Sequence, residues 1–104
     1  MDDETKVIEA IMKTFSAKRS SLTIEKAEGI TRGAFSDDAG TYITFKIIPD
    51  SFGALIDFSS DVFSGRDPKK LIDCFEYELE QVMLRNVKIE PAGSPSGLGF
   101  RLEY

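Results

Sequence analysis

The most regular pattern of apolar and polar positions runs from Asp67 to Arg85. At 100° per residue, six apolar side chains of this segment share one face, which is typical of a helix that packs on a sheet. They are Leu71, Ile72, Phe75, Leu79, Val82 and Met83. Asp67 suits the capping position, and Pro68 suits the first helical position because its missing N–H would be unpaired there anyway. The pattern therefore predicts a helix over residues 67–85.

The opposite face of this predicted helix is mixed in character. It carries Asp73 and Glu80, but also Tyr77 and Leu84, which the helical geometry turns toward solvent. A tyrosine surrounded by acids is a suitable contact for a basic partner. The alternative interpretation is structural: Leu84 tucks under the C-terminal turn and Tyr77 lies along its neighbours.

The remaining pattern predicts a second helix and several strands. Apolar residues recur at helical spacing over residues 3–17. Alternation of apolar and polar residues predicts strands at 22–27, 41–48, 52–58, 86–90 and 98–104. Glu28-Gly29 interrupts the first of these strands, and residues 30–36 are expected to continue its path after a bulge, so that this strand is split at Gly29.

Three connecting segments carry loop or turn chemistry. Residues 37–40, Asp-Asp-Ala-Gly, predict a turn in which aspartate side chains bond onward amides. Val62 and Phe63 are expected to anchor the loop before the 67–85 helix. Residues 91–97 hold two prolines and two glycines, so we expect no regular structure there.

The element order α-β-β-β-α-β-β places the chain in the α+β class. Short turns between neighbouring strands favour a mainly antiparallel sheet in a two-layer sandwich, with both helices packed on one face. Residues 1–104 are expected to form a single domain, because no repeat or linker is visible. Leu55 should lie on the sheet face away from the helices, near Tyr42 if the hairpin register allows, as a second apolar patch.

Charge adds a preference for partners. The net charge is −5, and residues 37–61 hold five aspartates against Lys46 alone, which gives −4 of that total. Such a field repels phosphate backbones and favours basic proteins, although net negative charge also simply keeps a small protein soluble. The one cysteine excludes an intrachain disulfide, the opening Met-Asp-Asp-Glu has the wrong charge for a secretory leader, and no apolar run reaches membrane-spanning length. We expect a cytoplasmic protein without membrane contact.

Catalytic chemistry is poorly represented in the sequence. No histidine is present, which removes the commonest general base and the usual transition-metal ligand. Cys74, at the edge of the apolar stripe, is read as structural. The glycines lack the spacing of dinucleotide or phosphate-binding loops, and the loop acids lack the alternation of a calcium loop. We expect no catalytic residue, no metal and no cofactor.

These observations favour a small acidic, non-enzymatic module for protein–protein interaction. It would bind and occlude another protein with a basic surface, as an inhibitor, an immunity-type protein or a phage-encoded host-defence antagonist does. The candidate contact residues are those of the helix face, the outer sheet patch and the acidic turn. They are Asp73, Tyr77, Glu80, Leu84, Tyr42, Leu55, Asp37 and Asp38.

Two alternatives stay open. The element order is similar to that of the type III secretion chaperones, which implies a dimer that wraps extended effector segments; the resemblance covers the arrangement only, and the family's usual terminal helix has no counterpart in residues 1–104. The second alternative is a weak nucleic-acid-binding module that uses Lys18-Arg19 or Lys69-Lys70 with Tyr42 as a stacking ring, against which the net charge argues.

Overall fold

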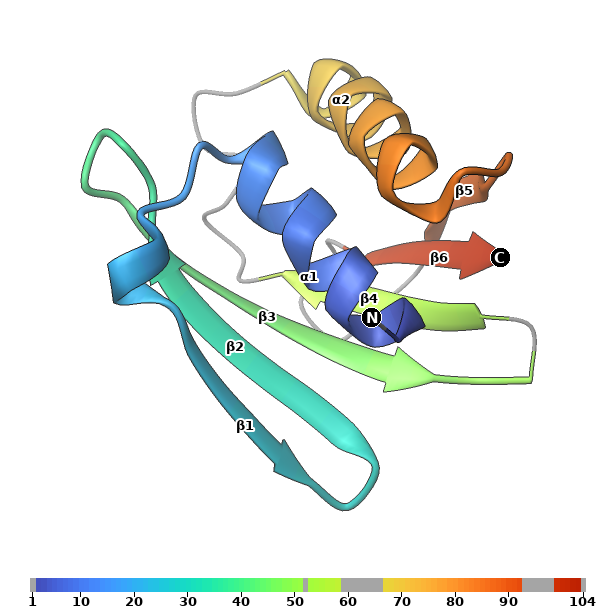
Figure 1. The fold of residues 1–104 in the computed structure, drawn as a ribbon, viewed down its shortest axis with the longest axis horizontal. Helices are drawn as coiled ribbons and strands as arrows, with labels where there is room; N and C mark the ends of the chain where they lie inside the picture. The colour runs from blue at the N-terminus through green and yellow to red at the C-terminus, as the bar shows by residue number, and fades with distance from the viewer. Residues whose placement is uncertain (1, 52, 59–66, 93–98, 104) are drawn as a thin grey trace.

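The structure is a computed structural model that describes residues 2–51, 53–58, 67–92 and 99–103 (Figure 1). The elements in chain order are α1 (Asp3–Thr14), the 3₁₀ turn η1 (Arg19–Ser21), β1 (Thr23–Ala27), β2 (Ile30–Ser36), β3 (Tyr42–Pro49), β4 (Gly53–Phe58), α2 (Pro68–Met83), β5 (Lys88–Ala92) and β6 (Gly99–Glu103). The order therefore has one strand more than the sequence pattern suggested.

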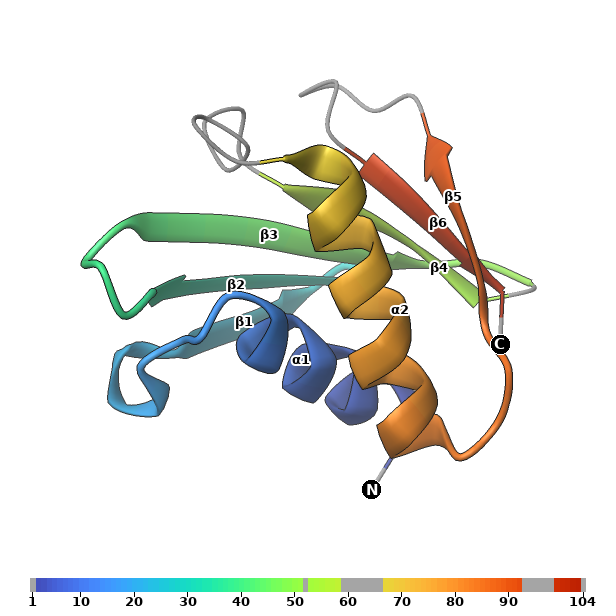
Figure 2. The same cartoon turned by 90° about the horizontal axis from the view of Figure 1, so that it is seen from above.

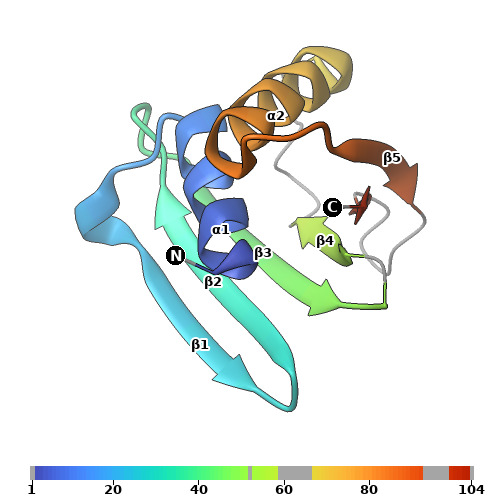
Figure 3. The same cartoon turned by 45° about the vertical axis from the view of Figure 1, so that its right-hand side comes forward.

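The strands form one antiparallel sheet in the order β1-β2-β3-β4-β6-β5. Both helices lie on the same side of this sheet and pack against each other (Figures 1 and 2). The β1–β2 hairpin extends past α1 on the side away from α2 (Figure 3). The predicted α+β class, the antiparallel sheet and the one-sided helices are confirmed, and the other sheet face has no helix of the described chain over it.

The bulge predicted at Glu28-Gly29 is wrong, because this dipeptide is the turn of a hairpin. Glu28 has φ 55° and Gly29 has φ 77°, so both central residues are left-handed, as in a type I′ turn. β1 then pairs back on β2, with Ala27 opposite Ile30. Asparagine or aspartate before glycine is the usual signal for this turn, and a glutamate in that place concealed it.

The irregular segment predicted to start at Pro91 starts later, because β5 continues to Ala92. Pro91 pairs with Phe100 of β6 in the register of the two strands. β5 is the last strand of the sheet, and a proline is tolerated there because an edge strand has one side without ladder partners. Val62, Phe63 and residues 93–97 lie outside the described residues.

The helix ends follow their capping residues. Asp67 accepts a hydrogen bond from the Lys69 N–H at 3.0 Å, as predicted, and Asp2 accepts one from the Thr5 N–H at 2.8 Å. α1 ends at Thr14, three residues before the predicted end at 17, because Ser16 turns left-handed with φ 52°. The chain then reaches Ala17, which forms an isolated β-bridge with Asp37.

Phenylalanine rings connect the two helices through the sheet. Ring centroids 5.5–6.4 Å apart link neighbours along one chain of contacts. In order, these rings are Phe45, Phe35, Phe15, Phe58, Phe100 and Phe75. All six are buried, as is Leu79 on the inner face of α2, so the predicted apolar stripe does pack into this core.

Candidate functional site

Two surfaces of the described chain are candidates for a functional site, and the first is the outer face of α2. We call Asp73, Tyr77, Glu80 and Leu84 the α2 ridge. Tyr77 is 62% exposed and Leu84 is 87% exposed, Asp73 is exposed and Glu80 is half-buried. The alternative in which Leu84 tucks under the helix end is therefore wrong. The structure brings these four predicted residues together on one helix face.

Leu84 has an unusual backbone conformation for its residue type. It caps α2 with φ 57° and ψ 35°, and its N–H donates to the Glu80 carbonyl oxygen at 2.9 Å. Helices commonly end in this left-handed conformation, but mostly with glycine, since a side chain there costs roughly 1–2 kcal/mol. At 87% exposure, the Leu84 side chain makes too little contact with the described residues to offset the cost.

The acids of the α2 ridge keep their charge available. Within the described residues, neither Asp73 nor Glu80 makes an ion pair. The ridge therefore combines two exposed apolar side chains with two carboxylates that no described cation neutralises. Cys74, which the sequence analysis read as structural, is exposed on the same helix.

The other predicted contact residues do not form one patch. Asp37 is only 2% exposed, because its carboxylate accepts hydrogen bonds from the N–H groups of Ala39 (2.9 Å) and Thr41 (2.8 Å) and holds the turn together. Asp38 is exposed beside it. The predicted bonding of onward amides is thus confirmed for Asp37, and the same burial removes this side chain from any contact surface.

Tyr42 and Leu55 are both on the outer sheet face, but far apart. Leu55 lies opposite Ile48 in the β3–β4 register, and Ile48 is six residues along β3 from Tyr42. At about 3.3 Å per residue this separation is roughly 20 Å. The predicted Tyr42–Leu55 patch is therefore wrong: Leu55 neighbours Ile48, and Tyr42, 64% exposed, stands alone at the other end of β3.

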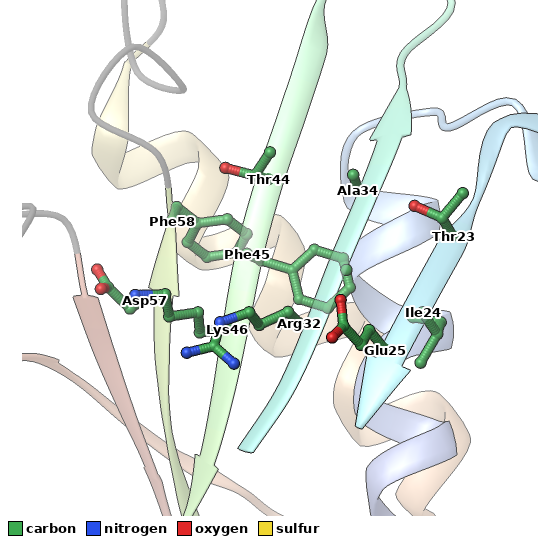
Figure 4. Close-up of a pocket in the computed structure, with 11 residues that line it drawn as sticks. Thr23, Ile24, Glu25, Arg32, Ala34, Thr44, Phe45, Lys46, Asp57 and Phe58 are labelled. Atoms are coloured by element: carbon green, nitrogen blue, oxygen red, sulfur yellow. The ribbon is translucent and has the colours of Figure 1, made fainter. Parts of the chain in front are cut away.

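The second surface is a cavity of about 690 Å³ on the sheet, shown in Figure 4 with both helices behind the strands. We call it the sheet groove. Its lining residues come from four neighbouring strands: Thr23, Ile24, Glu25, Arg32, Gly33, Ala34, Thr44, Phe45, Lys46, Asp57 and Phe58. Such a volume falls within the roughly 300–1,000 Å³ of typical ligand clefts.

A row of charged side chains crosses the sheet groove. Glu25 lies opposite Arg32, Arg32 opposite Lys46, and Lys46 opposite Asp57 in the registers of successive strand pairs. Figure 4 shows Arg32 and Lys46 between the two acids. The row thus reads negative, positive, positive, negative, and Asp57 is its one buried member.

The floor of the groove is built around a glycine. A Cβ at Gly33 would come within 2.2 Å of the Phe45 ring, so the absence of a side chain lets this ring lie over β2. Phe45 itself is 2% exposed and belongs to the aromatic core. The groove therefore has an apolar floor that is continuous with the core.

The groove is not evident in the sequence because the β1–β2 hairpin that forms part of it is not evident there. Period-two alternation puts Lys46 on the outer face, but Arg32 was assigned to the far side of a bulge, which leaves its facing direction undefined. The signal that identifies the groove is the pairing of charges along β1, β2 and β3 once Glu28-Gly29 is read as a two-residue turn.

One residue of the basic segment Lys18-Arg19 already forms an ion pair within the protein. Arg19 donates to both Glu9 carboxylate oxygens, at 2.8 and 2.5 Å. Through this hydrogen-bonded pair, the pKa of the Arg19 guanidinium is raised and the pKa of the Glu9 carboxyl is lowered. A phosphate-binding role for this segment would require Arg19 to exchange one anion for another.

Comparison with known proteins returns no match among protein-family models, curated proteins or solved structures. The described residues contain no group of three or more acids or cysteine side chains placed to hold a metal ion. Among the described helices, none has the length and apolarity needed to cross a membrane.

Proposed function

We propose that this protein is a non-enzymatic interaction module that binds and occludes another protein through the α2 ridge. The observation that carries the proposal is Leu84: a large apolar side chain, 87% exposed, in a backbone conformation that favours glycine. Residues that break a local folding rule without a compensating contact are the expected sites of function.

The partner's chemistry follows from the ridge. Leu84 and Tyr77 are seven residues apart, which is roughly 10 Å along a helix, so an occluded surface would offer two apolar contacts at that spacing. Asp73 and Glu80 would steer a basic rim, in keeping with the net charge of −5. The proposal is therefore an inhibitor, an immunity-type protein or a phage-encoded host-defence antagonist that acts on a basic target.

Leu84→Gly separates binding from folding. Relief of the left-handed strain is partly offset by the greater freedom of glycine in the unfolded chain, so we expect the free energy of unfolding to stay within about 1 kcal/mol of the parent value. Binding to the partner should weaken at least tenfold, because a hot-spot side chain is lost. Affinity capture followed by mass spectrometry identifies the partner, and calorimetry with the purified pair measures the loss.

A combined variant tests the whole ridge. Asp73→Asn, Tyr77→Ala and Glu80→Gln together should abolish capture while leaving the melting temperature unchanged. The matched control is Glu28→Gln with Glu90→Gln, which removes two negative charges at exposed positions outside α2. Full capture by the triple variant would contradict the proposal.

A dimeric, chaperone-like role is the second proposal. What supports it is the sheet face away from the helices, where half-buried Ile48 and Leu55 lie side by side. An apolar patch on an open sheet face is a common dimerisation surface. A strictly monomeric protein at micromolar concentration in sizing experiments would contradict this role and leave the α2 ridge proposal untouched.

A further inference from the structure

The centre of the sheet groove holds two cations directly opposite each other. Arg32 and Lys46 are register partners on β2 and β3, and both are exposed. Like charges in directly opposite positions destabilise a sheet. Neither makes an ion pair within the described residues, although Glu25 lies opposite Arg32 on β1. The fold therefore keeps a cationic pair at the centre of an acidic protein.

The surroundings of this pair select among anions. Glu25 and Asp57 border the two cations in the row, and the whole protein carries −5. A polyanion such as nucleic acid would meet the exposed Glu25 carboxylate and the overall negative field, and would be repelled. A ligand with one carboxylate and a nearby cation would instead be attracted: its carboxylate would neutralise Arg32 and Lys46, and its cation would pair with Glu25.

Strand spacing sets the distance between the two charges of such a ligand. Neighbouring strands lie about 4.8 Å apart, so a point midway between β2 and β3 is about 7 Å from β1, which carries Glu25. In an extended peptide, alternate side chains are about 6.7 Å apart and point the same way. A carboxylate and a cation two residues apart match this spacing, whereas adjacent residues face opposite sides.

We propose that the sheet groove binds an extended segment of a partner protein in which Asp or Glu is separated by one residue from Lys or Arg. The segment crosses the strands, with its carboxylate between Arg32 and Lys46 and its cation on Glu25. Thr23 lines the groove beside the row and supplies a hydroxyl group that bonds to the segment's backbone. The inference does not depend on the α2 ridge, which lies on a different element.

The test uses capped heptapeptides with serine at the remaining positions. In the first, glutamate and lysine are separated by one residue; in the second, of identical composition, they are adjacent. Each is titrated into isotope-labelled protein while the backbone amide shifts are followed by NMR. The expected result is saturable movement of the Arg32 and Lys46 amides with the first peptide, and binding at least tenfold weaker with the second, because a charge-assisted contact is lost.

Variants of the groove check the assignment of charges. Arg32→Gln with Lys46→Gln should remove the binding, and Glu25→Gln should remove the preference for the first peptide over the second. Lys69→Gln with Lys70→Gln makes the same change in net charge on the first turn of α2 and should bind as the parent does. Circular dichroism of each variant confirms that it is folded.

Three results would overturn the inference: equal binding of the two peptides, equal binding of inorganic phosphate at the same amides, or unchanged binding by the Arg32/Lys46 variant. None of them bears on capture through the α2 ridge. Conversely, loss of capture by the ridge variants leaves peptide binding at the groove intact, so failure of one proposal is distinguishable from failure of the other.

Discussion

The buried faces of the two helices are similar, whereas their solvent-facing sides differ in how their charged residues are used. Each begins with an aspartate cap, at Asp2 and Asp67, and each buries an apolar stripe in the shared core. The outer charges of α1 are used within the protein: Glu4 pairs with Lys26 at 3.1 Å and bonds to the Thr31 hydroxyl, and Glu9 pairs with Arg19. No described cation pairs with an acid of α2.

This difference shows how the same kind of residue can serve folding or recognition. The acids of α1 meet cations brought to them by the β1–β2 hairpin and by η1, so their charge fastens those elements to the helix. α2 has no such element of the described chain over its outer face. Its carboxylates, with Tyr77 and Leu84 between them, are left for a partner.

The largest expected effect is common to both helices. Ile11→Ala in α1 and Leu79→Ala in α2 should each lower the free energy of unfolding by about 2–5 kcal/mol, because both side chains are fully buried and their loss leaves a cavity. Urea denaturation measures both. If either variant costs less than about 1 kcal/mol, the inner faces are not equivalent.

A smaller loss is expected at the α2 cap. Asp67→Ala removes the acceptor for the Lys69 N–H and should cost about 1 kcal/mol of unfolding free energy in thermal or urea denaturation. Asp67→Asn keeps a capping oxygen and is the matched control, with an expected change of a few tenths. Equal losses in the two variants would assign the effect to charge and not to the hydrogen bond.

Acid should lower the stability of the fold through two carboxyl groups at α1. The pKa of Asp2 is lowered by the hydrogen bond from the Thr5 N–H, and the pKa of Glu9 is lowered by Arg19. A lowered pKa stabilises the fold above the ordinary values, 3.8 for Asp2 and 4.5 for Glu9, and this stabilisation is lost as pH falls through the folded values.

Denaturation across the range from neutral to strongly acidic pH measures this effect. Glu9→Gln should flatten the acid loss of stability, because it removes the carboxyl group whose pKa Arg19 lowers. A curve that Glu9→Gln does not change would show that the Glu9–Arg19 pair contributes nothing measurable, as many exposed pairs do.

The smallest effect is expected on the α2 ridge itself. Asp73→Asn and Glu80→Gln should change the free energy of unfolding by less than about 0.5 kcal/mol each, because neither acid has a described partner to lose. Thermal denaturation is the measurement. A loss of unfolding free energy above about 1 kcal/mol would show that these acids stabilise the fold, as the acids of α1 do.

Local chemistry was sufficient for several parts of the fold. The stripe of α2, the cap at Asp67, the Asp37 turn and the alternation of β3 all depend on residues within a few positions of each other, and all agree with the structure. The exposure of Tyr77 follows from the same helical periodicity, whereas Leu84 is exposed one residue past the helix, in the left-handed cap.

The predictions that were wrong concern residues whose structural environment is set by a segment distant in the sequence. Pro91 excludes a central strand but not an edge strand, and only the strand order makes β5 an edge. Leu55 is paired with Ile48 and not with a residue near Tyr42, because alternation along a strand does not specify the β3–β4 register. Asp37 is a contact candidate by its local sequence, but it is buried and forms a β-bridge with Ala17, a distant residue that the turn sequence does not indicate.

The sequence alone therefore determined the α+β class, the two amphipathic helices, the acidic balance and the contents of the α2 ridge. Tertiary structure decided the β1–β2 hairpin, the burial of Asp37 and the sheet groove with Arg32 opposite Lys46. The physical reason is that helical neighbours are three or four residues apart, whereas cross-strand neighbours are chosen by turns and registers, and a shift of one residue moves every side chain to the other face.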